Sequence, residues 1–161
     1  MIKLTVKSVL FSVCLLLPAL AMAADASEEI KRALMARHDV APVGELQKIA
    51  GGESELVEIL LELRQDNETP FVSVRAEKIL LDFGGRDDVA DALEADVNNP
   101  ETVGLARVVL LHVNRIPSSD TRVRVARAGV RRARAEPKLR TAVSGLEKSS
   151  DPRVRAVAQG E

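Results

Sequence analysis

The sequence has very few of the residues that serve redox chemistry, metal binding and base stacking. Tryptophan and tyrosine are absent, phenylalanine occurs three times, and the single cysteine is Cys14. Because Cys14 lies in an N-terminal segment that we expect to be removed, the remaining chain can form neither a disulfide nor a thiol nucleophile. The scarcity of aromatic rings counts against nucleic acid as a partner, since proteins that bind single strands stack bases on such rings.

Signatures of catalysis and of metal binding are also missing. The two histidines, His38 and His112, each stand alone, and there is no HExxH, CxxC or acidic calcium-loop motif. No serine stands in a Gly-x-Ser-x-Gly motif, and the glycine pairs at 51–52 and 84–85 are typical of helix ends rather than of phosphate loops. We therefore predict a protein that is not an enzyme, with no catalytic residue, no metal site and no cofactor.

The N-terminus has the three parts of a secretory signal peptide. Lys3 and Lys7 provide the positive start, residues 9–20 are almost wholly apolar, and Ala21 and Ala23 place small residues where signal peptidase reads them. We predict cleavage after Ala23 and export of the remaining chain. With no cysteine left after cleavage, the composition favours a bacterial periplasm over a disulfide-rich extracellular setting.

Two other interpretations of this segment compete with cleavage. The segment could stay attached as a membrane anchor, but its apolar run is about a dozen residues, whereas a spanning helix needs roughly 20. It could instead be a lipoprotein signal with Cys14 as the acylated residue. Such signals usually place a small residue just before the cysteine, where this chain has Val13.

The remaining chain is predicted to be helical. The whole sequence is 46% hydrophobic, which excludes disorder for lack of apolar content, and its valines recur at helical rather than alternating spacing. Ser27, Thr69, Asp120 and Asp151 are expected to cap helix starts. Start and stop signals predict helices over residues 28–37, 42–51, 53–65, 69–83, 87–97, 100–114, 121–133 and 137–148, and from 152 onwards.

An internal repeat is the most informative feature of the chain. The segment at 151–155, Asp-Pro-Arg-Val-Arg, echoes Asp-Thr-Arg-Val-Arg at 120–124, which is 31 residues earlier. Pro70 and Pro100, which each open a predicted helix, are 30 residues apart. The two offsets are out of phase, because Pro100 and residue 120 are only 20 residues apart. Either one helix of a pair is missing, or the helix at 121–133 is the second of a pair joined by a longer loop.

These starts, each followed by a helix rich in alanine and leucine, resemble HEAT-like repeats of the short kind found in phycobilin lyases and bacterial scaffold proteins. The resemblance is clearest over 151–158 and 120–128, fair over 74–84 and degenerate over 99–113, where Gly104 replaces the usual arginine. It implies an all-α fold, an α-α superhelix of stacked helix pairs whose helices line a surface for macromolecules. Tetratricopeptide repeats are the competing family, but aromatic residues mark their helices.

This interpretation divides the chain into three parts. We expect a signal peptide at 1–23, N-terminal helices or a capping segment at 24–52, and the HEAT-like repeat domain at 53–161.

The charge distribution is strongly polarised along the chain. Residues 24–100 contain 18 acidic and 8 basic side chains, whereas residues 101–161 contain 6 acidic and 13 basic ones. Helical spacing puts acidic side chains on shared faces, and it does the same for four arginines. The acidic sets are Glu55, Glu58 and Glu62, and Asp87, Asp91 and Glu94; the basic set is Arg124, Arg127, Arg131 and Arg134.

The four arginines are the candidate partner-binding residues, and two interpretations of them stay open. They could form a solvated helix face paired with Glu101, Glu136 or Glu147. They could instead dock an anionic partner: an acidic protein segment, anionic lipid headgroups or an acidic cell-wall polymer. Head-to-tail self-association, acidic end on basic end, is a further possibility.

The sequence thus favours an exported, non-enzymatic repeat protein that mediates protein–protein interaction or scaffolding in the cell envelope. One alternative is an accessory subunit or modifying enzyme of the lyase-like HEAT type, with its chemistry in a cryptic acidic cleft or in a partner. Another is a self-assembling envelope component.

Overall fold

The computed structural model describes residues 25–36, 41–66 and 68–160, and all regular structure in these segments is helical. The predicted signal peptide, with Cys14, Ala21 and Ala23, lies outside the described residues, as does His38. Within the described segments, no helix combines the length and apolar character needed to cross a bilayer. The prediction of an all-α fold is therefore confirmed.

The first of two compact units extends to Leu56 and contains a helix over residues 25–35 and α2 (Val43–Ala50). Ile30, Leu34 and Leu46 are completely buried. Gly51 ends α2 at φ 94°, a left-handed conformation that glycine adopts without strain. The prediction that Ser27 caps the first helix is wrong, because residues 25 and 26 are already helical.

The second unit, Val57–Glu161, begins within α3 and consists of helices joined by short turns and 3₁₀ segments. Its elements are α3 (Glu53–Leu63), α4 (Pro70–Leu80), η1 (Leu81–Phe83), α5 (Asp87–Asn98), η2 (Pro100–Thr102), α6 (Val103–Leu111), η3 (Val113–Arg115), α7 (Ser119–Ala133), η4 (Pro137–Leu139), α8 (Arg140–Gly145), η5 (Leu146–Lys148) and α9 (Pro152–Gln159). Most predicted helices fall within a few residues of these bounds.

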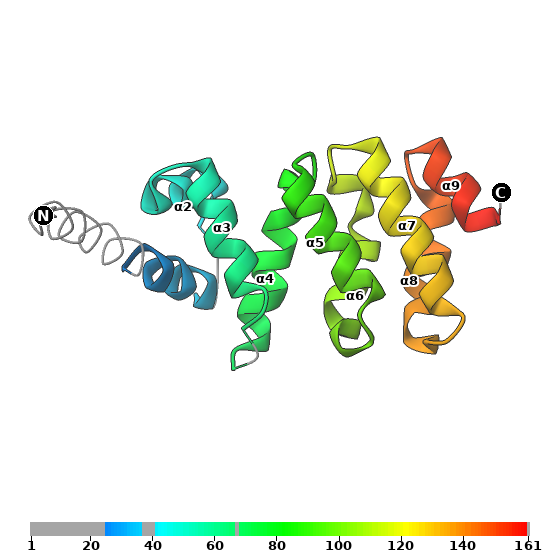
Figure 1. Cartoon of the computed structure of the whole chain (residues 1–161), viewed down its shortest axis with the longest axis horizontal. Helices are drawn as coiled ribbons and strands as arrows, with labels where there is room; N and C mark the ends of the chain where they lie inside the picture. Colours follow the sequence, from blue (N-terminus) through cyan, green and yellow to red (C-terminus); the bar gives the residue numbers. More distant parts are fainter. Residues whose placement is uncertain (1–24, 37–40, 67, 161) are drawn as a thin grey trace, which may run out of the picture. The chain divides into compact units, whose positions relative to one another are not determined.

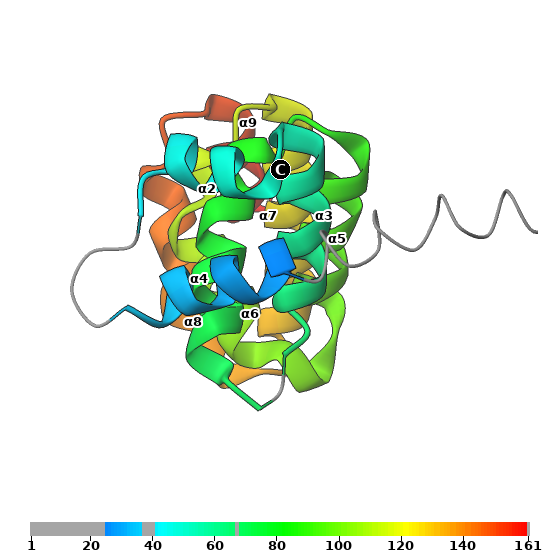
Figure 2. The same ribbon diagram turned by 90° about the vertical axis from the view of Figure 1, so that its left-hand side faces the viewer.

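These helices form two layers. In one layer α7 packs between α5 and α9, and in the other α6 packs between α4 and α8 (Figures 1 and 2). Leucine, valine and alanine fill the space between the layers. Gly129 of α7 is needed for this packing, since a Cβ atom there would lie 2.4 Å from Cδ2 of Leu110 on α6.

The layers explain the phase of the repeat. Pro70 and Pro100 open helices of the α4, α6, α8 layer, whereas the segments at 120 and 151 belong to α7 and α9 in the other layer. The two offsets therefore describe the two helices of a pair, and no helix is missing between α6 and α7.

Polar contacts recur with the same period. They join side chains 32 or 33 residues apart: Arg64 with Asp96, Asp82 with Arg115, Ser119 with Asp151 and Asp120 with Arg153. Each of these contacts links equivalent ends of successive helices. The repeat in the sequence thus corresponds to a repeat of contacts in space.

The helix caps are only partly as predicted. Asp151 caps α9 by accepting a hydrogen bond from the amide of Arg153 at 2.9 Å, which confirms that prediction. Asp120 does not cap α7, because the helix begins at Ser119 and the hydroxyl of Ser118 accepts from the amide of Thr121. Thr69 precedes α4 without a side-chain cap bond of its own.

Candidate binding surface and buried carboxyl cluster

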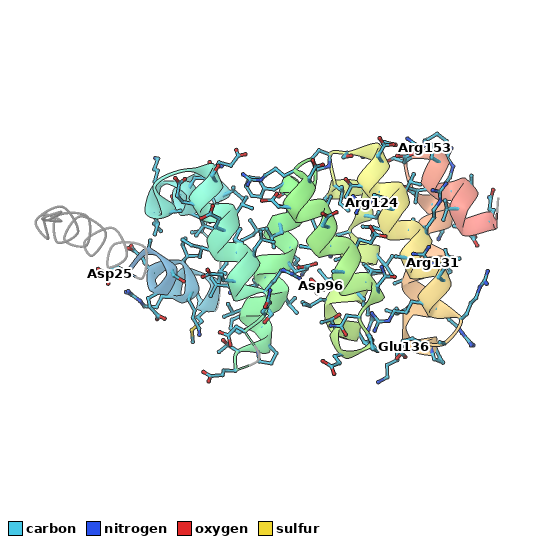
Figure 3. All side chains as sticks on the ribbon, viewed as in Figure 1. Asp25, Asp96, Arg124, Arg131, Glu136 and Arg153 are labelled. Carbon is cyan, nitrogen blue, oxygen red and sulfur yellow. The ribbon has the colours of Figure 1, made fainter. Side chains whose placement is uncertain are left out.

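The outer side of α7 carries the four arginines that the sequence singles out. Arg124, Arg127, Arg131 and Arg134 are all exposed (Figure 3). The residues between them are mostly alanine and valine, and these are buried against the neighbouring helices. The amphipathic pattern of α7 therefore fixes where the arginines point. The sequence prediction correctly placed all four side chains on one face.

Arg124 differs from the other three because it is already paired. Its Nε lies 2.9 Å from Oε2 of Glu94, and its Nη2 lies 2.7 Å from Oδ1 of Asp91. The hydrogen bonds to these two carboxylates raise the pKa of Arg124. Both partners belong to α5, so Arg124 connects α5 with α7. The interpretation that this face pairs with Glu101, Glu136 or Glu147 is wrong for Arg124, whose partners lie on the adjacent helix of its own layer.

Arg127, Arg131 and Arg134 have no hydrogen bond or ion pair in the part of the chain that the structure describes. They span seven residues of helix, or about 10 Å along its axis. We call these three residues the arginine trio. Three guanidinium groups at this spacing repel one another, so a partner with negative charge would relieve the repulsion.

Neighbouring arginines are satisfied within the protein, which sets the trio apart. The Nη1 atom of Arg132 donates to the carbonyl oxygens of Asp96 and Val97 at the end of α5, at 3.2 and 2.8 Å. Arg122 binds the carboxylate of Asp151 at 3.0 Å. Such contacts place cations on the free carbonyl groups and carboxylates that need them. The trio does no such structural work.

An acidic counterpart lies on α3. Glu55, Glu58 and Glu62 are exposed, and the described residues provide no hydrogen bond or ion pair to any of them. We call them the glutamate trio. The second predicted acidic face is different, because two of its members, Asp91 and Glu94, are partners of Arg124.

A buried group of charged residues was missed by the sequence reasoning. Glu77 of α4 is completely buried, Asp96 of α5 is 6% exposed, and the guanidinium of Arg64 binds the carboxylate of Asp96. Burial, together with the charge of Asp96, raises the pKa of Glu77 to about 8, although Arg64 opposes the shift. Burial also raises the pKa of Asp96.

Protonation accounts for the geometry of this cluster. Neither carboxyl oxygen of Glu77 accepts a hydrogen bond in the described part of the chain, which would be costly for a buried carboxylate. A protonated Glu77 instead donates its O–H to Asp96, which stays ionised beside Arg64. Near neutral pH the cluster therefore holds one proton, one carboxylate and one guanidinium.

A groove of about 600 Å³ lies next to the cluster, between the α3–α4 and α5–α6 turns. Its polar lining includes Arg64, Asp66, Asp96 and Glu101. Most of these groups are occupied, since Asp66 accepts from the amide and hydroxyl of Thr69 and Asp96 binds Arg64. Of the lining carboxylates, Glu101 is the one most available to a ligand in the described structure.

His112, at the end of α6, is half-buried. Burial lowers its pKa, and the nearby charges of Lys78 and Arg115 act in the same direction. A histidine surrounded by cations is a poor metal ligand. Among the described residues, histidine, cysteine and carboxylate side chains nowhere gather in groups of three or more that could hold a metal ion.

Comparison with protein-family models, with curated proteins and with solved structures gives no match for this chain. The functional argument therefore depends on the surface of α7, the face of α3 and the buried cluster.

Proposed function

We propose that this protein is an exported, non-enzymatic binding module of the cell envelope, built as a HEAT-like α-solenoid, and that it docks an acidic segment of a protein partner on the arginine trio. The two layers of helices and the contacts that recur every 32 or 33 residues support the solenoid architecture. The N-terminal pattern that ends at Ala23 supports export to the periplasm.

One observation carries the binding function: Arg127, Arg131 and Arg134 are exposed and unpaired in the described chain, although Arg124 on the same face is paired. Structural arginines in this protein find carboxylates or helix ends. Three that do not are available for an external anion. Their roughly 10 Å row on a rigid helix matches carboxylates three and four residues apart on a second helix.

An acidic protein fits this surface better than a membrane does. The neighbouring exposed positions on α7 add no large apolar side chain that could enter the acyl region of a bilayer. Nucleic acid fits poorly, because no aromatic ring accompanies the arginines. The trio alone therefore favours recognition by charge and spacing.

The experiment is affinity capture of the tagged protein from the native envelope after mild crosslinking, with washes at low and high salt. We expect one stoichiometric protein that is lost at high salt and absent when Arg127, Arg131 and Arg134 are replaced by glutamine. The matched control replaces Lys138, Arg140 and Lys148, which are exposed cations around α8, by glutamine. Equal capture by both variants would contradict the proposal.

A second candidate function, an accessory subunit or modifying enzyme, is favoured by the groove beside Asp96 and by the raised pKa of Glu77. Its ligand would be a small cationic molecule, because Asp66, Asp96 and Glu101 outnumber Arg64 in the lining. Thermal-shift screening with amines and guanidines tests this. Stabilisation that Glu101→Gln abolishes would support the candidate, and no stabilisation by any such compound would contradict it.

A further inference from the structure

The arginine trio and the glutamate trio have complementary spacing. Along α7, Arg127, Arg131 and Arg134 are separated by four and then three residues. Read backwards along α3, Glu62, Glu58 and Glu55 are also separated by four and then three residues. Both rows are exposed, and neither is neutralised within the described chain.

Helix geometry turns this spacing into a docking register. At 1.5 Å per residue, each row places its charges about 6 Å and then about 4.5 Å apart. Two antiparallel helices can therefore bring all three pairs together at once: Glu62 with Arg127, Glu58 with Arg131 and Glu55 with Arg134. A parallel arrangement would match only two of the three pairs. The antiparallel arrangement also brings the acidic first turn of α3 to the basic last turn of α7, where opposite helix-dipole charges meet.

We infer that the acidic segment docked on the arginine trio is the glutamate trio of a second copy of this chain. The inference rests on the proposed function, because it names the partner of the same surface. It also follows from the free charges of each copy: α7 offers an unpaired basic row, and α3 offers an unpaired acidic row. The contact is heterologous, because one copy contributes α3 and the other contributes α7. Repetition of such a contact leads to open chains of copies or, if the rotation closes, to rings.

The interaction is expected to be weak and to depend on salt. Exposed ion pairs contribute little individually, so three of them correspond to dissociation constants of about 100 µM or weaker. Salt at about 500 mM shortens the screening length to a few ångströms, so the association should disappear there. Growth with concentration, rather than one fixed stoichiometry, is the expected behaviour of a contact that does not close.

The test is sedimentation velocity on the purified full-length exported protein across a range of concentrations, at about 20 mM and about 500 mM salt. One variant reverses the basic row, with Arg127, Arg131 and Arg134 replaced by glutamate. The other reverses the acidic row, with Glu55, Glu58 and Glu62 replaced by arginine. A control with Lys138, Arg140 and Lys148 replaced by glutamate has the same change in net charge as the first variant. Circular dichroism checks that each variant is folded.

We expect the wild type and the control to associate at low salt, and each reversed variant alone to stay monomeric. An equimolar mixture of the two reversed variants should associate again, because the reversed α7 of one matches the reversed α3 of the other. The inference is overturned if the wild type stays monomeric, if either variant still associates, or if the mixture does not. If self-association is absent but the trio still captures a different acidic protein, the proposed function stands and only this inference falls.

Discussion

The charged residues of this protein fall into two regions with opposite character. In the interior, Arg64, Glu77 and Asp96 share one proton and one ion pair, and the pKa of Glu77 is raised to about 8. On the outer side of α7, the arginine trio lies in water without a partner in the described chain. The comparison teaches that the number of charges says little about their role. Burial makes the interior group important for stability, whereas exposure leaves the trio free for binding. Each substitution below tests one side of this comparison.

Replacement of Arg64 by methionine should have the largest effect. The change leaves two buried carboxyl groups without a cation, and breaking a buried pair in this way costs about 3–5 kcal/mol. The loss in the free energy of unfolding should be larger at pH 8 than at pH 5, because the carboxyl groups can take up protons at the lower pH. Urea unfolding at the two pH values measures this. A loss below about 1 kcal/mol at pH 8 would show that the interior group is not under electrostatic stress.

Glu77→Gln should act in the opposite direction and stabilise the protein at neutral pH. The folded pKa of about 8 lies above the model value of 4.5, so the unfolded chain releases this proton first. Stability therefore falls as pH rises from about 4.5 to about 8 and then levels off. Glutamine does not ionise, and its amide can still donate to Asp96. We expect a gain of about 3 kcal/mol at pH 7 and almost none at pH 4. An unchanged pH profile of unfolding would contradict this account.

Asp151→Ala should have an intermediate effect. Hydrogen bonds from Ser119, Arg122 and the amide of Arg153 lower the pKa of Asp151, the hydroxyl of Ser119 most of all. The stability that these bonds provide is present above the unfolded pKa and is lost as pH falls through the folded one. Removal of a helix cap costs about 1 kcal/mol. Thermal unfolding of the variant at pH 7 and at pH 3 should show a smaller difference from the wild type at the lower pH.

The contrast between these regions was only partly visible in the sequence. Caps, prolines and apolar spacing predicted nearly every helix, and the spacing of the arginines predicted their shared face. Glu77 escaped because it stands beside Lys78 in a polar-looking stretch of α4, and only contacts across 13 and 19 residues, with Arg64 and Asp96, show that it is buried. The pairing of Arg124 escaped for the same reason, since it depends on α5 lying next to α7.

The smallest effects on stability are expected on the outer side of α7, and here the difference between Arg124 and the trio becomes measurable. Arg124→Gln removes two exposed ion pairs and should cost less than about 1 kcal/mol, since such pairs contribute little in water. Replacement of the whole trio by glutamine should cost nothing measurable, or slightly stabilise the protein by relieving repulsion. Binding should respond in the reverse order, strongly to loss of the trio and weakly to loss of Arg124. If the trio variant instead unfolds at clearly lower urea concentration than Arg124→Gln, those three arginines have structural partners, and the argument that they are free for binding fails.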